Sequence, residues 1–377
     1  MAPSLIERQL LRIRNGVPYY AGLNRVQSAQ TPKDLVWQRD TARLWRFRSD
    51  DRRISPPVLI VHSLISKSYI LDLLPGNSMV GFLVGEGFDV FMLDWGRAYP
   101  ADAQNTLETY VDDYVPSAIA AVGEVTGADD VTLAGYCLGG VLTVLLAAAD
   151  PGSIRNLVAL TTPCDFNELG FLGQMFIEGR LDAEDVIDST GLVPARVLDQ
   201  GFQSLKPTDA LIQQVNVWQN LWNDEWLTGF IAMNKWTRDQ VPLSGALLRQ
   251  IVAMFVRDNV MASGVVQLGD REVSLSTIDM PFLNVFCRRD ELVPPRSAKP
   301  LVGLVGSKDA TELCLESGHV GLVAGREAAK VSRPQIADWI RSRSEKPARR
   351  SARRGSRQAK PKRQESGDGN TTRSSAR

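Results

Sequence analysis

Short, uninterrupted apolar runs recur along the chain, and turn-forming or polar residues bound each of them. Runs of this length are typical of strands that are buried on both faces of a sheet. Before them, Thr31–Arg48 alternates apolar and polar residues, which predicts an edge hairpin. The six expected buried strands are Pro56–Ser63, Phe88–Trp95, Asp130–Cys137, Ile154–Pro163, Pro281–Asp290 and Ala310–Gly318.

Helical patterns separate most of these strands. Apolar residues recur at helical spacing in Thr106–Val125, Leu138–Ala149 is rich in Ala and Leu, and Gln335–Ser342 continues a last helix. Residues 1–30 predict a helical lead-in. Because strands alternate with helices, we expect an α/β fold with a mostly parallel sheet and helices on both of its faces.

The alternation breaks between Cys164 and Ile278, where the sequence is largely helical and aromatic. We interpret this stretch as a cap inserted after the fourth buried strand. Trp218, Trp222 and Trp226 are spaced as on one face of a helix, so they either form the core of the cap or line an acyl tunnel or subunit interface. The expected domains are a core of residues 1–163 and 279–343, a cap of residues 164–278 and a tail of residues 344–377.

The composition is ordinary for a globular protein, with 44% hydrophobic and 23% charged residues, but the charge is unevenly distributed. The formal net charge is zero, whereas Arg341–Arg377 carries 13 Lys and Arg against three Asp and Glu. This segment is nearly free of apolar residues, so we expect it to be disordered. It is either a solvated tail or an electrostatic tether to an anionic surface.

Several classes of protein are not indicated. There is no run of 18 apolar residues to predict a membrane span, and the N-terminus lacks the apolar region of a secretory signal. The four cysteines form no CxxC pair and no dense disulfide framework. We therefore expect a cytoplasmic protein without a metal site. Only two histidines, His62 and His319, are available as a catalytic base.

The most informative motif is Gly135-Tyr136-Cys137-Leu138-Gly139-Gly140, which lies between an expected strand and an expected helix. This is the context of the nucleophile elbow, a sharp turn that exposes a nucleophile at the carboxyl edge of an α/β-hydrolase sheet. Cys137 is the expected nucleophile, and the amino end of the following helix favours its thiolate. The backbone amide of Leu138 is the expected first oxyanion donor.

The partners of the nucleophile should follow it along the chain. In an α/β-hydrolase the order is nucleophile, acid, base. His319 follows the last expected strand and is the expected general base. Asp290 ends the fifth strand and is the expected acid, and Asp165, at the end of the fourth strand, is its rival.

The end of the first buried strand is the expected place of an oxyanion loop. We expect His62 to shape this loop rather than to transfer protons. The second oxyanion donor is then a backbone amide at Ser63 or Leu64. Asp94, which ends the second strand, is expected to be structural.

A wider set of motifs carries a family resemblance. Besides the cysteine elbow, these motifs are Thr31-Pro32-Lys33, Tyr69-Ile70-Leu71-Asp72-Leu73, Asp94-Trp95-Gly96, Leu205-Lys206-Pro207, Lys235-Trp236, Asp290-Glu291-Leu292-Val293-Pro294 and Gly318-His319-Val320-Gly321. On these motifs the chain resembles the catalytic subunit of class III, two-subunit polyhydroxyalkanoate synthases over roughly residues 5–343. It departs from the family pattern at His62–Ser68 and at Ser317-Gly318-His319.

The resemblance implies an acyltransferase that polymerises 3-hydroxyacyl-CoA into polyhydroxyalkanoate and releases CoA. The acyl group would be carried as a thioester on Cys137, with Asp290 and His319 as its partners. The implied partners are a growing polyester chain or granule, a second copy in a homodimer and a second synthase subunit. No cofactor is expected, because 3-hydroxyacyl-CoA is a substrate.

Two other functions stay open. A cysteine-dependent hydrolase, either a thioesterase or an intracellular polyester depolymerase, would use the same three residues and differ in its access to water. A non-enzymatic, granule-associated or scaffolding protein is the third reading. The intact Cys137, Asp290 and His319 argue against a scaffold, whereas the altered loop His62–Ser68 argues for one.

Overall fold

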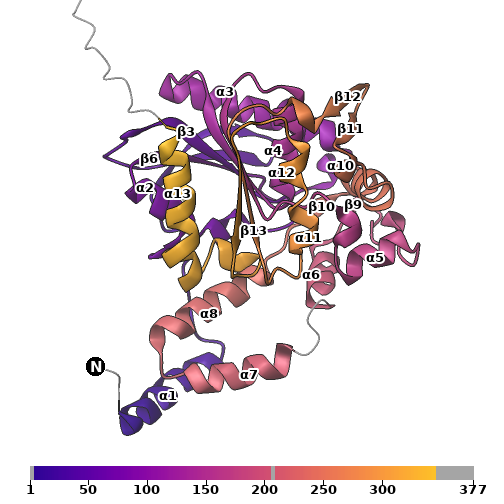
Figure 1. Cartoon of the computed structure of the whole chain (residues 1–377). Helices are drawn as coiled ribbons and strands as arrows, with labels where there is room; N and C mark the ends of the chain where they lie inside the picture. The colour runs from indigo at the N-terminus through magenta and orange to yellow at the C-terminus, as the bar shows by residue number, and fades with distance from the viewer. Residues whose placement is uncertain (1–3, 205–208, 345–377) are drawn as a thin grey trace, which may run out of the picture. The chain divides into compact units, whose positions relative to one another are not determined.

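The protein, seen here in a computed structural model that describes residues 4–204 and 209–344, is built on an eight-stranded sheet (Figure 1). The strand order is β1-β2-β6-β3-β7-β8-β13-β14. The pairs β1–β2 and β2–β6 are antiparallel, and all other neighbouring strands of this sheet are parallel. The strands are β1 (Lys33–Arg39), β2 (Ala42–Phe47), β3 (Ile54–Val61), β6 (Phe88–Asp94), β7 (Val131–Tyr136), β8 (Ile154–Leu160), β13 (Phe282–Cys287) and β14 (Ala310–Leu315).

The predicted edge hairpin, five of the six buried strands and the α/β fold with a mostly parallel sheet are therefore confirmed. The sixth strand, β14, is present, but its prediction as a buried strand is wrong, because β14 forms the edge of the sheet and only its last residue, Leu315, is buried. The central strands are continuously apolar because helices cover both of their faces. The covering helices are α2 (Met79–Gly85), α3 (Val115–Thr126), α4 (Leu138–Ala149), α11 (Pro295–Ala298), α12 (Leu301–Leu304) and α13 (Arg333–Ser342). The predicted helix Thr106–Val125 is present as α3 preceded by a π-helix at Thr109–Tyr114.

Alternate side chains of the central strands point to opposite faces of the sheet. On β3, Leu59 and Val61 lie in an apolar cluster with residues of α3 and α4. Val58 and Ile60 lie in a second cluster with residues of α2 and α13. This packing holds the carboxyl ends of the strands in fixed register, and the sequence places its candidate catalytic residues at those ends.

The stretch from Cys164 to Ile278 is largely helical, as predicted, and it also forms two small antiparallel sheets. Part of it, including Phe255 and Val266, lies in the same apolar cluster as the main sheet. The boundaries of a separate cap therefore stay a prediction. Its elements are α5 (Phe171–Ile177), β9 (Leu192–Val193), α6 (Ala195–Ser204), α7 (Asp209–Asn220), α8 (Asp224–Thr237), β10 (Leu243–Ser244), α9 (Gly245–Gln250), α10 (Val260–Ser263), β11 (Val265–Leu268) and β12 (Arg271–Ser274).

The prediction that Trp218, Trp222 and Trp226 share one helix is wrong. Helix α7 ends before Trp222, and α8 begins after it. Asn223 caps α8, because its side-chain oxygen accepts a hydrogen bond of 3.1 Å from the amide of Trp226. An asparagine at this place starts a new helix, and this local hydrogen bond outweighs the helical spacing of the tryptophans.

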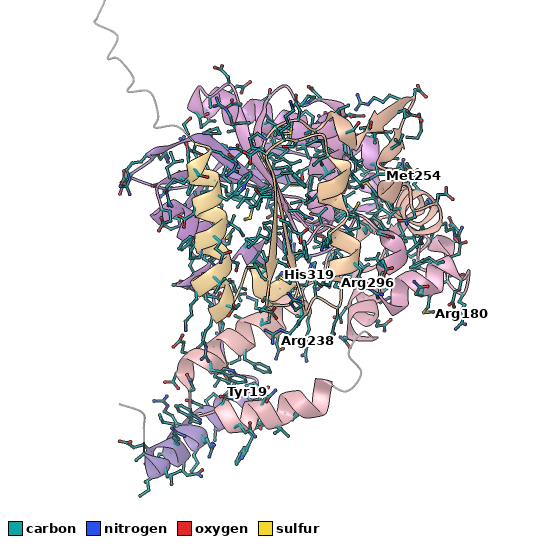
Figure 2. The ribbon with its side chains drawn as sticks, viewed as in Figure 1. Tyr19, Arg180, Arg238, Met254, Arg296 and His319 are labelled. Atoms are coloured by element: carbon teal, nitrogen blue, oxygen red, sulfur yellow. The ribbon has the colours of Figure 1, made fainter. Side chains whose placement is uncertain are left out.

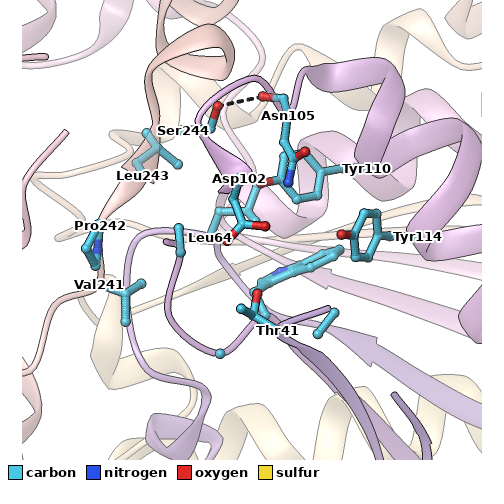
Figure 3. Close-up of a pocket in the computed structure, with 14 residues that line it drawn as sticks. Thr41, Leu64, Asp102, Asn105, Tyr110, Tyr114, Val241, Pro242, Leu243 and Ser244 are labelled. Carbon is cyan, nitrogen blue, oxygen red and sulfur yellow. Dashed lines mark hydrogen bonds between the residues drawn. The ribbon is translucent and has the colours of Figure 1, made fainter. Parts of the chain in front are cut away.

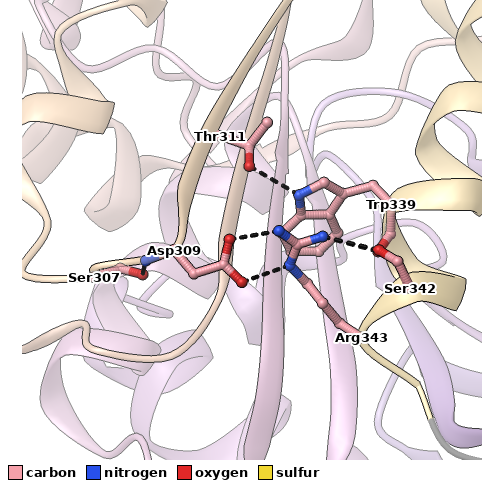
Figure 4. A network of polar contacts seen from close by, with 6 residues as sticks. All are labelled: Ser307, Asp309, Thr311, Trp339, Ser342 and Arg343. Carbon is pink, nitrogen blue, oxygen red and sulfur yellow. Dashed lines mark hydrogen bonds and ion pairs between the residues drawn. The ribbon is translucent and has the colours of Figure 1, made fainter.

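Polar contacts join the end of α13 to the start of β14 (Figure 4). Arg343 pairs with Asp309 at 2.5 Å and lies over the ring of Trp339, whose indole donates to Thr311. These contacts fix the last helix on the sheet. The predicted basic tail follows, and apart from Ser344 it lies outside the described residues. Within the described ranges, no helix combines the length and apolar character needed to cross a membrane.

Candidate active site

Cys137 occupies a sharp turn between β7 and α4. Its backbone has a φ of 55° and a ψ of −121°, a conformation that a residue with a side chain rarely adopts. The turn packs closely on its surroundings, since a methyl group on Gly135 would overlap Thr143 and one on Gly139 would overlap the backbone of Val61. The two glycines therefore let a strained turn present Cys137 at the carboxyl end of the sheet.

The ring of His319 lies between Asp290 and Cys137. Its Nδ1 is 2.8 Å from Oδ2 of Asp290, and the ring is near enough to Cys137 for that side chain to raise the pKa of His319. The other oxygen of Asp290 accepts the backbone amides of Leu292 and Val293 at 2.9 and 2.8 Å. Asp290 is buried and both of its oxygens are engaged, so its carboxylate is held in one orientation toward His319.

Neighbouring parallel strands bring the acid and the base together. Asp290 follows β13, and His319, which Figure 2 labels, follows β14. The amide of Arg289 donates to the carbonyl of Ser317 at 2.9 Å, which ties the two loops to each other. Asp165 does not reach this site, because its Oδ1 accepts hydrogen bonds from Asn167 and Asn259. The structure thus joins His319 with Asp290 and not with Asp165.

The electrostatics favour a charged imidazolium. Burial by itself lowers the pKa of His319, but the charges of Asp290 and Cys137 and hydrogen bonds to both raise the pKa to about 10. A cysteine at an elbow beside a histidine that an aspartate orients is the arrangement of an activated sulfur nucleophile and its base. The site can therefore attack an acyl carbonyl and return a proton to the leaving group.

His62 is buried and belongs to the loop beside the elbow. Burial lowers the pKa of its ring to about 4, so the ring is neutral at neutral pH. It stacks on Tyr136 with ring centroids 5.6 Å apart, and its Nε2 lies 3.1 Å from Oγ of Ser66. The stacking on Tyr136 and the contact with Ser66 hold His62 in place within the loop, as expected of a residue that shapes it.

The two expected oxyanion donors flank the elbow. Leu138 is the first residue of α4, and Leu64 is a buried residue of the loop that follows β3. No hydrogen-bond acceptor is found for either amide within residues 4–204 and 209–344. Gly139 lies against the carbonyl of His62, so this loop and the amino end of α4 are in close contact. The role of the two amides stays a prediction.

A small pocket adjoins the loop at Leu64 (Figure 3). The rings of Trp95, Tyr110 and Tyr114 line it together with residues from β10 and the segment before it. The indole of Trp95 donates to the carbonyl of His62 at 2.7 Å. The pocket thus adjoins the loop that follows β3, and its lining does not include the three candidate catalytic side chains.

Sequence reasoning missed several residues that hold the site. The hydroxyl of Tyr136 donates to the carbonyl of His319 at 3.3 Å, and its ring lies beside both histidines. The indole of Trp236 donates to the carbonyl of Lys67 at 2.7 Å. Tyr136 is the variable residue of the elbow motif and Trp236 belongs to the Lys-Trp motif, but neither motif by itself shows what these side chains contact.

The residues that the structure describes contain no cluster of three His, Cys, Asp or Glu side chains that could hold a metal ion. The three other cysteines do not join the site. Cys164 and Cys287 are buried and Cys314 is exposed. Burial, followed by the charge of a nearby aspartate, raises the pKa of Cys164 and of Cys287 to about 12, so both are poor nucleophiles.

Comparison with known proteins agrees with this geometry. Residues 56–324 match the family described as alpha/beta hydrolase fold, and residues 24–83 match the family described as poly-beta-hydroxybutyrate polymerase (PhaC) N-terminus. A crystal structure of a hydrolase from Pseudomonas aeruginosa aligns with 82% of this chain and 99% of its own, with a TM-score of 0.50 and 15% identity. That likeness shows the fold alone.

Two relatives are similar over most of this chain. The poly(3-hydroxyalkanoate) polymerase subunit PhaC of Allochromatium vinosum is 32% identical over 336 residues, which cover 88% of this chain and 94% of the relative. The protein of the same name from Haloferax mediterranei is 31% identical over 326 residues, 86% of this chain, and this chain spans 66% of its length. The chain therefore has the α/β-hydrolase fold and belongs to the poly(3-hydroxyalkanoate) polymerase family.

Proposed function

We propose that this chain is an acyltransferase that polymerises 3-hydroxyacyl-CoA into polyhydroxyalkanoate and releases CoA, with Cys137 as the nucleophile. The observation that carries the proposal is a cysteine, in place of the usual serine, at the elbow beside the His319–Asp290 pair. A thiolate that attacks a thioester forms another thioester, so the acyl group stays activated for the next transfer. A serine would form an oxoester and lose that activation.

In the first step, the thiolate of Cys137 attacks the thioester carbonyl of the substrate. The amides of Leu138 and Leu64 are the proposed donors to the oxyanion that forms. The intermediate then collapses and breaks the bond between the acyl carbon and the CoA sulfur. His319 gives its proton to the departing CoA thiolate, which leaves a neutral ring and an acyl group on Cys137.

In the second step, the secondary hydroxyl of a 3-hydroxyacyl unit attacks the thioester on Cys137. Neutral His319 takes the proton of that hydroxyl as the new ester bond forms, and the thiolate of Cys137 is released beside a protonated ring. Asp290 orients this ring. Its lack of exposed side-chain surface and its two engaged oxygens support an orienting role over direct contact with the hydroxyl.

Exclusion of water decides between polymerisation and hydrolysis, because water would release the acyl group as a free acid. Cys137 is 8% exposed and the side chain of His319 is 10% exposed. This burial supports the transferase over a thioesterase or depolymerase that uses the same residues.

The test supplies purified protein with 3-hydroxybutyryl-CoA and measures CoA, polymer and free acid in the same reaction. The proposal expects CoA release accompanied by polymer. Free acid without polymer would move the assignment to a cysteine-dependent hydrolase. The Cys314→Ser variant is the matched control, because Cys314 is an exposed thiol outside the site, and it should keep the activity of the parent protein.

We also propose that the enzyme works in the cytoplasm at the surface of a polyester granule, with a second synthase subunit. The names of the similar proteins describe them as polymerase subunits, which supports the partner. Co-expression with a second synthase subunit should raise the rate of CoA release. If the isolated chain already reaches full activity, the required partner is excluded.

A further inference from the structure

The pocket beside the loop at Leu64 contains a carboxylate that the chain almost encloses. Asp102 lines this pocket and is 8% exposed. Its Oδ2 accepts the backbone amide of Tyr99 at 2.8 Å. Within residues 4–204 and 209–344 the carboxylate forms no ion pair, although a carboxylate is rarely buried to this extent unless a cation accompanies it.

Three aromatic rings line the same pocket and pack on one another. The ring centroid of Trp95 lies 5.2 Å from that of Tyr110 and 6.0 Å from that of Tyr114. Burial chiefly raises the pKa of Tyr110 to about 12, and the charge of Asp102 contributes to the rise, so this phenol is neutral and near the carboxylate. Of the described residues that line the pocket, Asp102 alone carries a charge at neutral pH.

The chemistry of this lining selects one class of ligand. A carboxylate and the faces of aromatic rings both attract cations. A divalent metal ion needs several oxygen ligands, and the described residues contain no group of three His, Cys, Asp or Glu side chains that could hold one. Aromatic rings replace the water around a weakly hydrated ion more readily than that around a strongly hydrated one. The lining therefore fits a weakly hydrated monovalent cation.

The cationic side chain that contacts these rings is engaged elsewhere. The guanidinium of Arg39 lies 5.3 Å from the ring centre of Tyr114, but Arg39 pairs with Asp113 and does not line the pocket. The hydroxyl of Tyr114 donates to Asp40 at 2.7 Å, so that carboxylate is also occupied outside the pocket. Arg39 therefore does not balance the charge of Asp102.

We propose that this pocket binds one weakly hydrated monovalent cation, ammonium or potassium, between the carboxylate of Asp102 and the rings of Trp95 and Tyr110. Figure 3 shows the carboxylate directed into the pocket on the side of Leu64. The site is separate from the candidate catalytic residues, and the proposal does not depend on the proposed chemistry.

The first test measures the thermal unfolding temperature of the full chain while potassium chloride or ammonium chloride replaces lithium chloride at constant ionic strength. Lithium is the reference because it holds its water strongly. The unfolding temperature of the parent protein should rise and then level off as either ion is added, since a ligand that binds the folded state stabilises it. A response to ammonium alone would assign recognition to its N–H groups. The same unfolding temperature in all three salts would overturn the proposal.

The second test uses Asp102→Asn, which removes the charge and keeps an oxygen for the amide of Tyr99. In lithium chloride this variant should be at least as stable as the parent, because an unpaired buried charge is gone. The potassium concentration for half of the stabilisation should rise by at least about tenfold. Asp270→Asn is the matched control, since Asp270 is an exposed carboxylate between β11 and β12, and it should respond like the parent. A parent-like response of Asp102→Asn would refute the site.

A third test examines the aromatic contact with a matched pair of variants. Tyr110→Phe and Tyr110→Leu both lack the hydroxyl, but only Tyr110→Phe keeps an aromatic face. The half-saturating concentration of potassium should be about threefold or more higher in Tyr110→Leu. Equal values in the two variants would exclude contact between the cation and this ring.

The cation should also act on the neighbouring loop. Leu64 lines the pocket, and the indole of Trp95 donates to the carbonyl of His62. Potassium should therefore slow the hydrogen exchange of backbone amides in His62–Ser68 in the parent protein and leave it unchanged in Asp102→Asn. Equal exchange with and without potassium in the parent would overturn the link between the cation and the loop.

Discussion

At the residue scale, the proposed nucleophile is Cys137, which stands at the strained turn beside the His319–Asp290 pair. Cys137→Ala should reduce CoA release by at least about 1,000-fold, since no other nucleophile is in place. Cys137→Ser should be similarly impaired because a hydroxyl is far less acidic than a thiol. Circular dichroism should show the parent fold in both variants, and normal turnover of Cys137→Ala would refute the assignment.

His62 gives a prediction about pH and stability. Its folded pKa of about 4 lies below the ordinary value of about 6.5, so the folded state favours the neutral ring. The stabilising contribution is fully present above about pH 6.5 and is lost as the pH falls through 4, by on the order of 3 kcal/mol.

The test compares the parent protein with His62→Phe, which keeps a ring against Tyr136 but does not titrate. Urea unfolding at pH 7 and at pH 4.5 should show a larger acid loss of unfolding free energy in the parent protein. Since the carboxylates titrate in both proteins, the difference between their acid losses of unfolding free energy gives the contribution of His62. Equal losses in the two proteins would contradict a neutral, buried ring.

At the scale of elements, α8 and the segment after it hold the loop His62–Ser68. The indole of Trp236 donates to the carbonyl of Lys67, and the amide of Val241 donates to the carbonyl of Ile65 at 3.4 Å. The departure of residues 62–68 from the family pattern therefore falls on a loop whose backbone is fixed by another part of the chain.

Trp236→Phe should remove that hydrogen bond and keep an aromatic ring. We expect kcat to fall about tenfold with little change in KM, because a mobile loop stabilises the transition state less well than it binds the substrate. The unfolding free energy should change by about 1 kcal/mol. Trp226→Phe is the control on the same helix, since Trp226 stacks on Phe230 instead, and it should keep the parent kcat.

At the scale of the whole molecule, a buried guanidinium joins distant parts of the chain. Arg333 is 1% exposed and donates to the carbonyls of Gly76 and Val323 and to the side chain of Asn77. Burial lowers its pKa to about 10. Val323 lies four residues after His319, so this cluster holds the segment that carries the base against the turn between β4 (Asp72–Leu74) and β5 (Asn77–Ser78).

Arg333→Met should therefore lower the unfolding free energy by about 3 kcal/mol, because a buried charged donor loses its hydrogen bonds to three acceptors, of which the carbonyl of Val323 is buried. The matched control is Arg48→Met, which removes an exposed ion pair with Asp34 and should cost no more than about 1 kcal/mol. Urea unfolding of the three proteins measures both values. Equal costs for the two variants would show that the buried cluster adds nothing beyond an exposed pair.

Much of the molecule follows from local patterns in the sequence. The continuous apolar strands, the bounds of α4 and the elbow around Cys137 are decided by residues close together in the chain. A strand that is buried on both faces needs an uninterrupted run of apolar residues, and a tight turn needs glycines, so both can be recognised in the sequence. Short sequence motifs, the cysteine elbow among them, also indicated the family, and the comparisons confirm it. The roles of Cys137, Asp290, His319 and the two amides remain a proposal.

Only the tertiary structure decided which groups meet. Asp290 and Asp165 both end buried strands, and His319 contacts Asp290 because β13 and β14 are neighbours in the sheet. The exposed apolar face of helix α1 (Leu5–Tyr20) could not be read from its sequence either, because an amphipathic pattern does not say which face the rest of the chain will cover. Sequence alone determined the elements and their candidate chemistry, since these depend on nearest neighbours. The pairing of strands and the packing of helices decided the site and the free surface, since these depend on contacts between residues far apart in the chain.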